Sequence, residues 1–128
     1  MGKKQVYISE DERKKCKRVI DAFEEFFEEL HDKEDCIVAV DVGGYGFVLL
    51  QYYKPGSGFE NCNTYTDSKE LFEDLWDEWF GTTLLQLTKG TALEEERFED
   101  MFKALPKDKQ KELQDKRIYF AEKADIDL

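Results

Sequence analysis

Two β-rich apolar segments separated by glycines constrain the fold more than any other feature of this chain. Residues 36–42 (CIVAVDV) and 47–54 (FVLLQYYK) are rich in β-branched and aromatic side chains. Between them lie residues 43–46 (GGYG), a connection of hairpin length. The pattern predicts two antiparallel strands. Because both segments are apolar at nearly every position, we expect the strands to be covered on both faces.

The glycine-rich connection permits a second interpretation, which its neighbours disfavour. Residues 38–44 (VAVDVGG) resemble the first phosphate-binding segment of the sugar-kinase and actin-like ATPase superfamily, with Asp41, Gly43 and Gly44 matching. Tyr45, however, stands where that family has a small hydroxyl residue, and 128 residues are too few for its two large lobes. A strand also follows the glycines where a phosphate loop would lead into a helix. We therefore predict a tight turn, for which glycine is suited by its access to positive φ, with Asp41 as an acid beside the turn.

Helical periodicity precedes the strands, and a weaker strand pattern follows them. Ser9 with Glu12 forms a capping-box pattern, and apolar residues at helical spacing predict a helix from about Glu10 to His31. Residues 59–65 (FENCNTY) predict a third strand, which we place at an edge of the sheet because it is more polar.

A further helix is expected directly after the strands. It begins near Ser68, because Asp67 and Glu70 provide a cap signal. Whether residues 82–89 continue this helix stays open, since Gly81 and two threonines weaken the helical pattern.

Two more helices complete the predicted order. Thr91 with Glu94 marks the start of one, and Pro106 suits the first turn of the last. The order predicts an α+β fold in a single domain spanning residues 1–128. It consists of a long N-terminal helix, an antiparallel β-hairpin or three-stranded sheet, and three C-terminal helices.

No motif in the sequence indicates a metal site or a catalytic centre. Cys16, Cys36 and Cys62 are odd in number and contain no C-x-x-C, which favours free, packed thiols in a reducing cytoplasm. His31, the only histidine, lacks zinc-ligand spacing. No nucleophile can be matched with a base and an orienting group. We predict no cofactor, no metal and no enzymatic activity.

Net charge is the strongest global signal. Thirty acidic residues against nineteen basic ones give a net charge of −11. A chain this acidic is expected to avoid nucleic acid and anionic membranes, because binding either requires positive charge, and to attract basic protein partners. No stretch approaches the ~20 apolar residues of a membrane span.

The acidic residues gather on one face of each of two predicted helices, opposite aromatic residues. The same-sign neighbours lie at i,i+4 spacing, where each pair destabilises an isolated helix by about 0.2–0.5 kcal/mol. The segment from Pro106 onward, in contrast, holds six acids and six bases. The acids that we select as partner-binding candidates are Glu24, Glu25, Glu28 and Glu29 on the first helix and Glu70, Glu73, Asp74, Asp77 and Glu78 on the helix after the strands.

We interpret these acidic faces as docking surfaces for a basic partner, with Tyr45 at the hairpin tip as an exposed aromatic anchor. In composition the chain is similar to small bacterial or phage inhibitors, namely toxin-immunity, anti-restriction and anti-CRISPR proteins. That similarity implies a non-enzymatic nucleic-acid mimic that masks a basic surface of a nucleic-acid-handling enzyme. Two alternatives remain: an accessory domain whose charge serves only solubility, and a small enzyme with an unrecognised carboxylate site.

Overall fold

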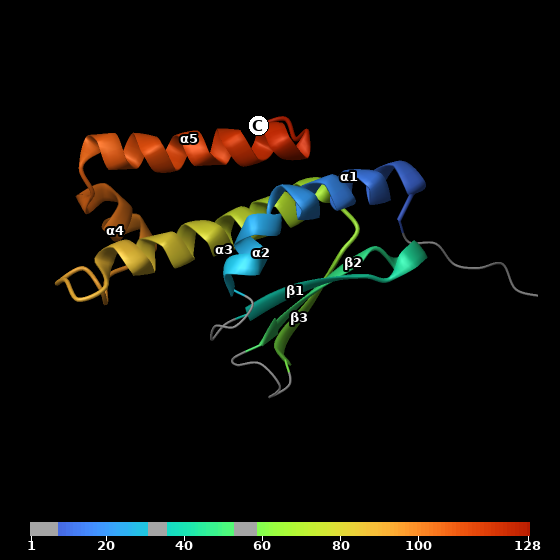
Figure 1. The fold of residues 1–128 in the computed structure, drawn as a ribbon, viewed down its shortest axis with the longest axis horizontal. Coiled ribbons are helices and arrows are strands. Elements are labelled where there is room, and N and C mark those ends of the chain that lie inside the picture. The colour runs from blue at the N-terminus through green and yellow to red at the C-terminus, as the bar shows by residue number, and fades with distance from the viewer. Residues whose placement is uncertain (1–7, 31–35, 53–58) are drawn as a thin grey trace, which may run out of the picture.

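The computed structural model describes residues 8–30, 36–52 and 59–128, and it confirms an α+β fold with one helical region before the sheet and helices after it (Figure 1). The elements in chain order are α1 (Glu10–Ala22), α2 (Glu24–Leu30), β1 (Cys36–Asp41), a 3₁₀ turn (Gly43–Tyr45), β2 (Phe47–Tyr52), β3 (Phe59–Tyr65), α3 (Ser68–Thr88), α4 (Phe98–Ala104) and α5 (Lys107–Ala124). The third strand has the predicted bounds.

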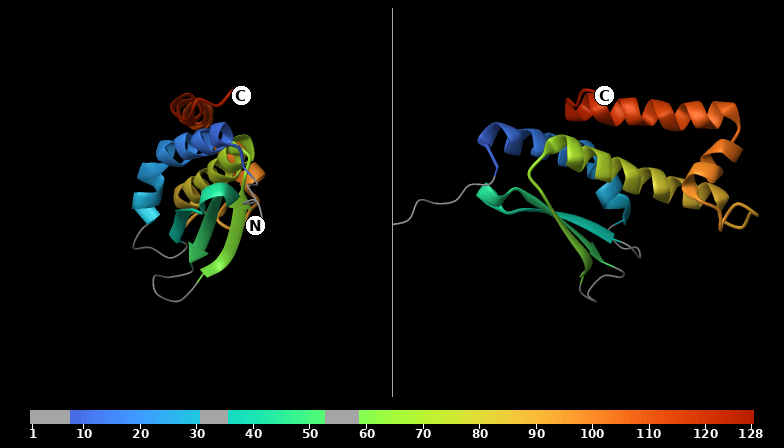
Figure 2. Two further views of the ribbon diagram at one scale, coloured as in Figure 1. Left: turned by 90° about the vertical axis from the view of Figure 1, so that its right-hand side faces the viewer. Right: turned by 180° about the vertical axis from the view of Figure 1, so that it is seen from behind.

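The described elements form three layers. The sheet is one outer layer, α1 and α3 lie across one of its faces, and α5 lies on the far side of those two helices (Figures 1 and 2). The strands are antiparallel in the order β1-β2-β3, with Ala39, Leu49 and Asn63 side by side across the sheet.

Apolar residues from all three layers meet in one core. Phe23 at the end of α1 is fully buried and stacks on Phe120 of α5 at 4.4 Å between ring centroids. From the sheet, Phe47, Leu49 and Tyr65 reach the same cluster and are each less than 10% exposed. The face of the sheet that carries them is called the inner face below, and the opposite one the outer face.

The connection between β1 and β2 is the predicted turn. Gly43 and Gly46 have φ values of 63° and 96°, which side chains disfavour, and a Cβ on Gly46 would lie 2.2 Å from the carbonyl oxygen of Tyr65. The Asp41 carboxylate accepts a hydrogen bond from the Gly43 N–H at 2.8 Å and pairs with Arg13 of α1. These contacts account for the aspartate and the glycines without a phosphate.

The helix predicted from Glu10 to His31 is instead two helices, and its final residue lies outside the described part of the chain. The first helix ends at Ala22, and the backbone of its C-cap residue, Phe23, leaves helical geometry at φ −102° and ψ 14°. The break lets α1 pack on α3 and α5 while α2 turns toward β1. A straight helix could not make both sets of contacts.

The region after the sheet matches the prediction at both ends but not in the middle. Asp67 caps α3 through hydrogen bonds from the N–H groups of Lys69 and Glu70, and the helix continues to Thr88. The predicted helix start at Thr91 is wrong: residues 91–96 form turns, and α4 begins at Phe98. Pro106 is the N-cap residue directly before α5.

The expectation that both faces of the sheet are covered is also wrong for the described residues. Helices α1 and α3 cover the inner face, but no described element packs on the outer face (Figure 2). Val38 and Val40 of β1 point outward and are 40% and 36% exposed. The apolar pattern therefore identified the strands correctly but not the surroundings of their two faces.

Candidate functional site

The acidic residues of α3 point toward two different neighbours. Glu73 faces α5, where its carboxylate pairs with the guanidinium of Arg117 at 2.5 Å. Asp74, one position later, faces the sheet and accepts a hydrogen bond from the Tyr65 hydroxyl at 2.6 Å. Asp77 and Glu78 follow one helical turn later on the sheet side, while Glu70 is exposed. The predicted acidic face is thus divided by the packing of its helix.

A polar hollow lies where α3 crosses the sheet. Its volume is ≈ 230 Å³. The lining residues are Asp74, Asp77 and Glu78 from α3 and Ile37, Leu49, Gln51, Asn63 and Tyr65 from the strands. Asn63 and Tyr65 share a face of β3, as the alternation in that strand predicts. The inner face therefore changes from apolar near the hairpin to polar beneath Asp74, Asp77 and Glu78 of α3.

The hollow continues toward α4 as a wider groove of ≈ 760 Å³, which has Ile37, Gln51, Asp77 and Glu78 in common with it. We call the two together the α3 cleft. Its far wall adds residues from α3 and α4, namely Phe80, Gly81, Thr82, Leu85, Phe98, Glu99 and Phe102. Leu85 and Phe98 are 47% and 46% exposed, so apolar surface lies directly beside the carboxylates.

Gly81 allows α4 to form this wall. A Cβ at Gly81 would lie 2.9 Å from the ring of Phe98, so only glycine lets that ring approach the backbone of α3 so closely. From the sequence, Gly81 was interpreted only as a weak point in a helix. A glycine inside a helix can also be a signal of close packing, and this is the one sequence signal by which the approach of another element to Gly81 could have been found.

Electrostatics in the cleft disfavour the ionised form of Asp77. The pKa of Asp77 is raised by partial burial first and then by the carboxylates of Glu73 and Asp74, while Arg117 opposes that shift. The pKa of Tyr65 is raised far above its usual range by burial and by its hydrogen bond to Asp74. Tyr65 therefore keeps its proton and acts as a donor, and Asp77 is a carboxylate whose ionised form a nearby cation would stabilise.

The acidic residues of α2 have different surroundings. Glu24, Glu25, Glu28 and Glu29 are all exposed, and no described cation lies within ion-pair distance of them. Glu24 and Glu28 flank a groove of ≈ 370 Å³ between the helices and β1, with Ile20, Phe27, Ile37, Val38 and Ala39 as its apolar lining. Ile37 lines this groove and the α3 cleft, so the two acidic groups approach β1 from two sides.

Tyr45 does not belong to either acidic group. It is 47% exposed, as predicted, and it lines a separate hollow at the hairpin end with Val42, Val48, Thr64 and Thr66. Val48 and Thr64 lie on the outer face of the sheet, whereas the α3 cleft lies on the inner face. The structure thus places the proposed aromatic anchor and the acids of α3 on opposite sides of the sheet.

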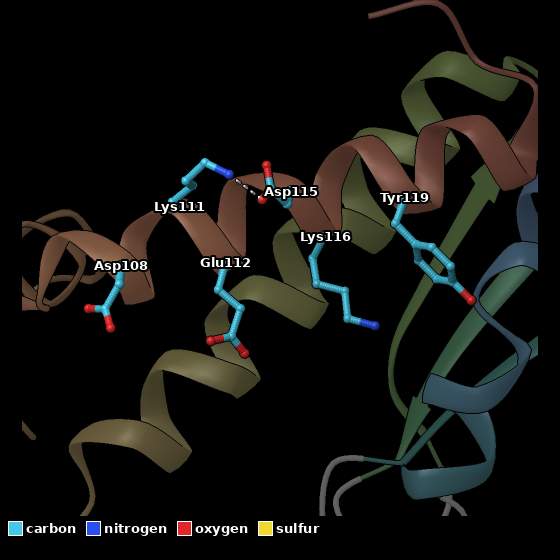
Figure 3. Close-up of a pocket in the computed structure, with 6 residues that line it drawn as sticks. All are labelled: Asp108, Lys111, Glu112, Asp115, Lys116 and Tyr119. Carbon is cyan, nitrogen blue, oxygen red and sulfur yellow. Dashed lines mark hydrogen bonds and ion pairs between the residues drawn. The ribbon is translucent and has the colours of Figure 1, made fainter.

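A further hollow, of ≈ 440 Å³, runs along α5 and serves as a contrast (Figure 3). All of its lining residues come from that one helix. Lys111 pairs with Asp115 at 3.1 Å, and Lys109 pairs with Glu112 at 3.2 Å. Charge on α5 is therefore compensated locally, in agreement with the balanced charge of the segment from Pro106 onward, and this surface lacks the same-sign crowding of the α3 cleft.

Of the two cysteines whose side chains are described, Cys16 agrees with the prediction of a packed thiol and Cys62 does not. Cys16 is fully buried, and burial followed by the nearby carboxylate of Glu12 raises its pKa to about 11, which leaves the thiol protonated. Cys62, in contrast, is exposed. The side chain of Cys36 and all of His31 lie outside the described part of the structure.

Within residues 8–30, 36–52 and 59–128, no group of three or more acidic, histidine or cysteine side chains is arranged to hold a metal ion. None of the described helices combines the length and apolar character that crossing a membrane requires. No family model, curated protein or solved structure matches the chain. Function must therefore be inferred from the geometry of the site.

Proposed function

We propose that this chain is a non-enzymatic binding protein whose α3 cleft receives a basic, partly apolar segment of another protein. The observation that carries the proposal is the placement of Asp77 and Glu78 in a concave cleft beside the exposed Leu85 and Phe98. A lysine or arginine entering the cleft would stabilise the Asp77 carboxylate, whose ionised form its neighbours disfavour.

The chemistry of the cleft also defines the form of the segment. Carboxylates at one end and aromatic walls at the other suit a segment that carries cationic and apolar side chains within one or two helical turns. An amphipathic helix provides this spacing and is a common ligand of such grooves. Apolar contacts would provide much of the affinity. The charges would fix the orientation of the bound segment and raise its association rate.

The acids of α2 extend the same proposal to a broader surface. Glu24 and Glu28 lie on the other side of Ile37 from Asp77, so a basic partner that covers β1 would contact both groups. A basic surface of this size is typical of enzymes that handle nucleic acids. We therefore propose a partner of that class, and a role as an inhibitor or immunity-type protein that masks its basic surface.

Two other functions make different predictions. If the charge serves only solubility, neutralising the cleft will change no interaction. If the cleft is an enzyme site, Asp74, Asp77 and Glu78 must carry the chemistry, because Tyr65 keeps its proton and is committed to Asp74. A divalent cation or a nucleotide that raises the melting temperature of the wild-type protein, but not of Asp77→Asn, would favour the enzyme.

The decisive experiment compares two variants of equal net charge. Asp77→Asn with Glu78→Gln neutralises the cleft, and Glu95→Gln with Glu96→Gln neutralises two exposed residues in the turns before α4. The probe is an amphipathic helical peptide with one lysine-rich face and one leucine-rich face. Its affinity for each protein is measured by calorimetry at low and at moderate salt concentration.

We expect the cleft variant to bind the peptide at least about tenfold more weakly, and the control variant to bind it nearly as the wild type does. Raising the salt concentration should narrow the difference, since screening weakens exposed ion pairs. Equal binding by both variants, or no binding by the wild type, would exclude the cleft as the docking site. Affinity capture from host lysate with the same three proteins would then identify the natural partner.

A further inference from the structure

The free edge of β1 presents backbone groups with which no described strand pairs. The sheet order is β1-β2-β3, so β1 has a neighbouring strand on one side only. The Val42 N–H donates to the carbonyl oxygen of Gly46, directly across the hairpin, and this bond identifies one hydrogen-bonded pair of the β1–β2 ladder. Such pairs alternate along an antiparallel ladder. The N–H and C=O groups of Val38 therefore face β2, and those of Ile37 and Ala39 face the free edge.

The groove of ≈ 370 Å³ between the helices and β1 runs along this edge. Its lining includes three successive residues of the strand, Ile37, Val38 and Ala39. Successive side chains of a strand point to opposite faces, so a groove that reaches all three must follow the edge. Ile20 of α1 and Phe27 of α2 form its apolar wall, and α2 lies beside β1 (Figure 2). The backbone groups of the edge therefore open onto a concave, partly apolar surface.

Two carboxylates of α2 give the groove its charge. Glu24 and Glu28 both line it, and both are exposed. They are four residues apart on one helix, so a single cationic side chain in the groove can contact both. Glu25 and Glu29 lie on the same helix and are equally exposed, but they do not line the groove. Free backbone groups, an apolar wall and two selected carboxylates thus meet at one edge of the sheet.

We propose that the edge of β1, together with this groove, binds an extended basic segment of a partner protein as an additional strand. Strand addition to an open edge is a common mode of peptide recognition, in which backbone hydrogen bonds provide affinity and alternate side chains provide specificity. Side chains of the segment that point toward α2 are lysine or arginine, whose methylene stems lie along Phe27 while their charges reach Glu24 and Glu28. Side chains on the other face of the segment are apolar and lie beside Val38.

Charge selects this occupant over a second copy of the chain. Pairing of two β1 edges would bring two α2 helices together on one side of the joined sheet, and with them the carboxylates of both copies. The α3 cleft differs in the form of its ligand, because it offers no strand edge and suits a helix. Only Ile37 lines both grooves, so the β1 edge can bind its segment whether or not the α3 cleft binds a helix.

The first test changes only the ligand. The probe is a peptide of eight residues in which lysine and valine alternate, and its affinity is measured by calorimetry. Two further peptides carry N-methyl groups on all lysine amides or on all valine amides. Because the amides of a strand point alternately to its two edges, we expect one methylated peptide to bind at least about tenfold more weakly and the other to bind nearly as the parent does. Loss with lysine methylation indicates an antiparallel added strand, and loss with valine methylation a parallel one.

The second test changes the charge of the groove. Glu24→Gln with Glu28→Gln neutralises the two lining residues, and Glu25→Gln with Glu29→Gln is the control of equal net charge on the same helix. The first pair should weaken binding of the alternating peptide at least about tenfold, and the control should bind it nearly as the wild type does. Added salt should narrow the difference.

The third test changes the edge itself. Ala39→Pro removes the outward N–H of Ala39 and leaves the ladder with β2 intact, so it should weaken peptide binding without changing the circular dichroism spectrum. The control is Thr64→Pro at the free edge of β3, where the same alternation points the Thr64 N–H outward. Because the methylated peptides need no change in the protein, the proposal can be tested even if Ala39→Pro misfolds.

Four results would overturn the proposal. The first is no binding of the peptide by the wild type, and the second is equal binding of the two methylated peptides. The third is a loss of peptide binding in Asp77→Asn with Glu78→Gln, which would place the peptide in the α3 cleft. The fourth is a dimer of the wild type that Ala39→Pro dissociates, since a second copy would then occupy the edge.

Discussion

The two faces of the sheet carry similar apolar side chains but have opposite surroundings. On the inner face Phe47 and Leu49 are 2% and 7% exposed beneath α1 and α3, whereas Val38 and Val40 on the outer face are 40% and 36% exposed. Residues of similar apolar character therefore differ in exposure by a factor of five or more. The comparison teaches that apolar alternation identifies strands, while the cover of each face depends on helices that lie far away in the sequence.

The inner face also changes along its own length, and the candidate site lies at that change. Near the hairpin it carries Phe47 and Tyr65, which pack into the core, and farther along it carries Gln51 and Asn63, which line the α3 cleft. Helix α3 crosses the sheet, and its residues Asp74, Asp77 and Glu78 line the hollow above that polar part. The cleft is therefore the place where the cover of the inner face stops being apolar.

The strongest test of the inner and outer faces is to remove one apolar side chain from each. Phe47→Ala should lower the free energy of unfolding by roughly 3–5 kcal/mol, because it leaves a cavity between the sheet and α1. Val40→Ala should lower it by less than about 1 kcal/mol in the monomer, since the side chain is already in contact with solvent. Urea denaturation at low protein concentration measures both. Similar losses in the two variants would mean that the outer face is covered in the monomer.

The hairpin joins the two faces, and its glycines provide the second test. Gly46→Ala must accept a positive φ and also a clash with the Tyr65 carbonyl, whereas Gly43→Ala has a positive φ but open space around its Cβ. We expect backbone strain to lower the free energy of unfolding of each variant by roughly 1–2 kcal/mol. The clash with the Tyr65 carbonyl should lower that of Gly46→Ala clearly further. Thermal unfolding followed by circular dichroism compares them. An equal loss would show that the turn can move away from β3.

Features fixed by local chemistry could be predicted from the sequence. Ser9 accepts the hydrogen bond expected of a helix N-cap, and the third strand begins and ends where its composition changes. Features fixed by distant contacts could not. At the predicted start, the Thr91 hydroxyl accepts a hydrogen bond from the Leu93 N–H, but the Glu94 carboxylate accepts one from the N–H of Gly90. These bonds close a turn, and the next helix begins only at Phe98, whose ring lies against Gly81.

The candidate site follows the same division. Same-sign crowding on one helix is visible in the sequence, and two of the residues that it selects as partner-binding candidates, Asp77 and Glu78, lie in the α3 cleft. Their role in binding stays a prediction. Nothing local distinguishes Glu73 from Asp77, which are one helical turn apart, yet Arg117 of α5 pairs with the first and not with the second. The sequence could not reveal that difference, because it depends on where α5 packs.

The hydrogen bond between Tyr65 and Asp74 gives a smaller, pH-dependent effect at the edge of the cleft. Tyr65→Phe should lower the free energy of unfolding by about 0.5–1.5 kcal/mol at neutral pH. The folded protein raises the pKa of Tyr65, so the stability that this residue provides is present below the unfolded pKa of 10.0 and is lost as pH rises above it. The difference between wild type and variant should therefore shrink in alkali. A constant difference from neutral to alkaline pH would contradict the assignment of the raised pKa.

The smallest expected effect concerns Asp77 and has the opposite sign to the others. Its pKa is raised in the folded state, so the stability linked to its proton is present below the unfolded pKa of 3.8 and is lost as pH rises through the folded value. Asp77→Asn removes that loss and should leave the protein slightly more stable at neutral pH, by less than about 0.5 kcal/mol because the site is partly solvated.

Denaturation across acid and neutral pH should show this gain appearing only above the pKa of Asp77. Glu95→Gln, in an exposed turn, is the control and should show no comparable gain. A residue that weakens the fold when charged but strengthens the binding of a basic peptide is expected of a docking site, because its charge is compensated only in the complex. If Asp77→Asn instead destabilises the protein at neutral pH, the carboxylate has a structural role, and the comparison with the apolar part of the inner face no longer holds.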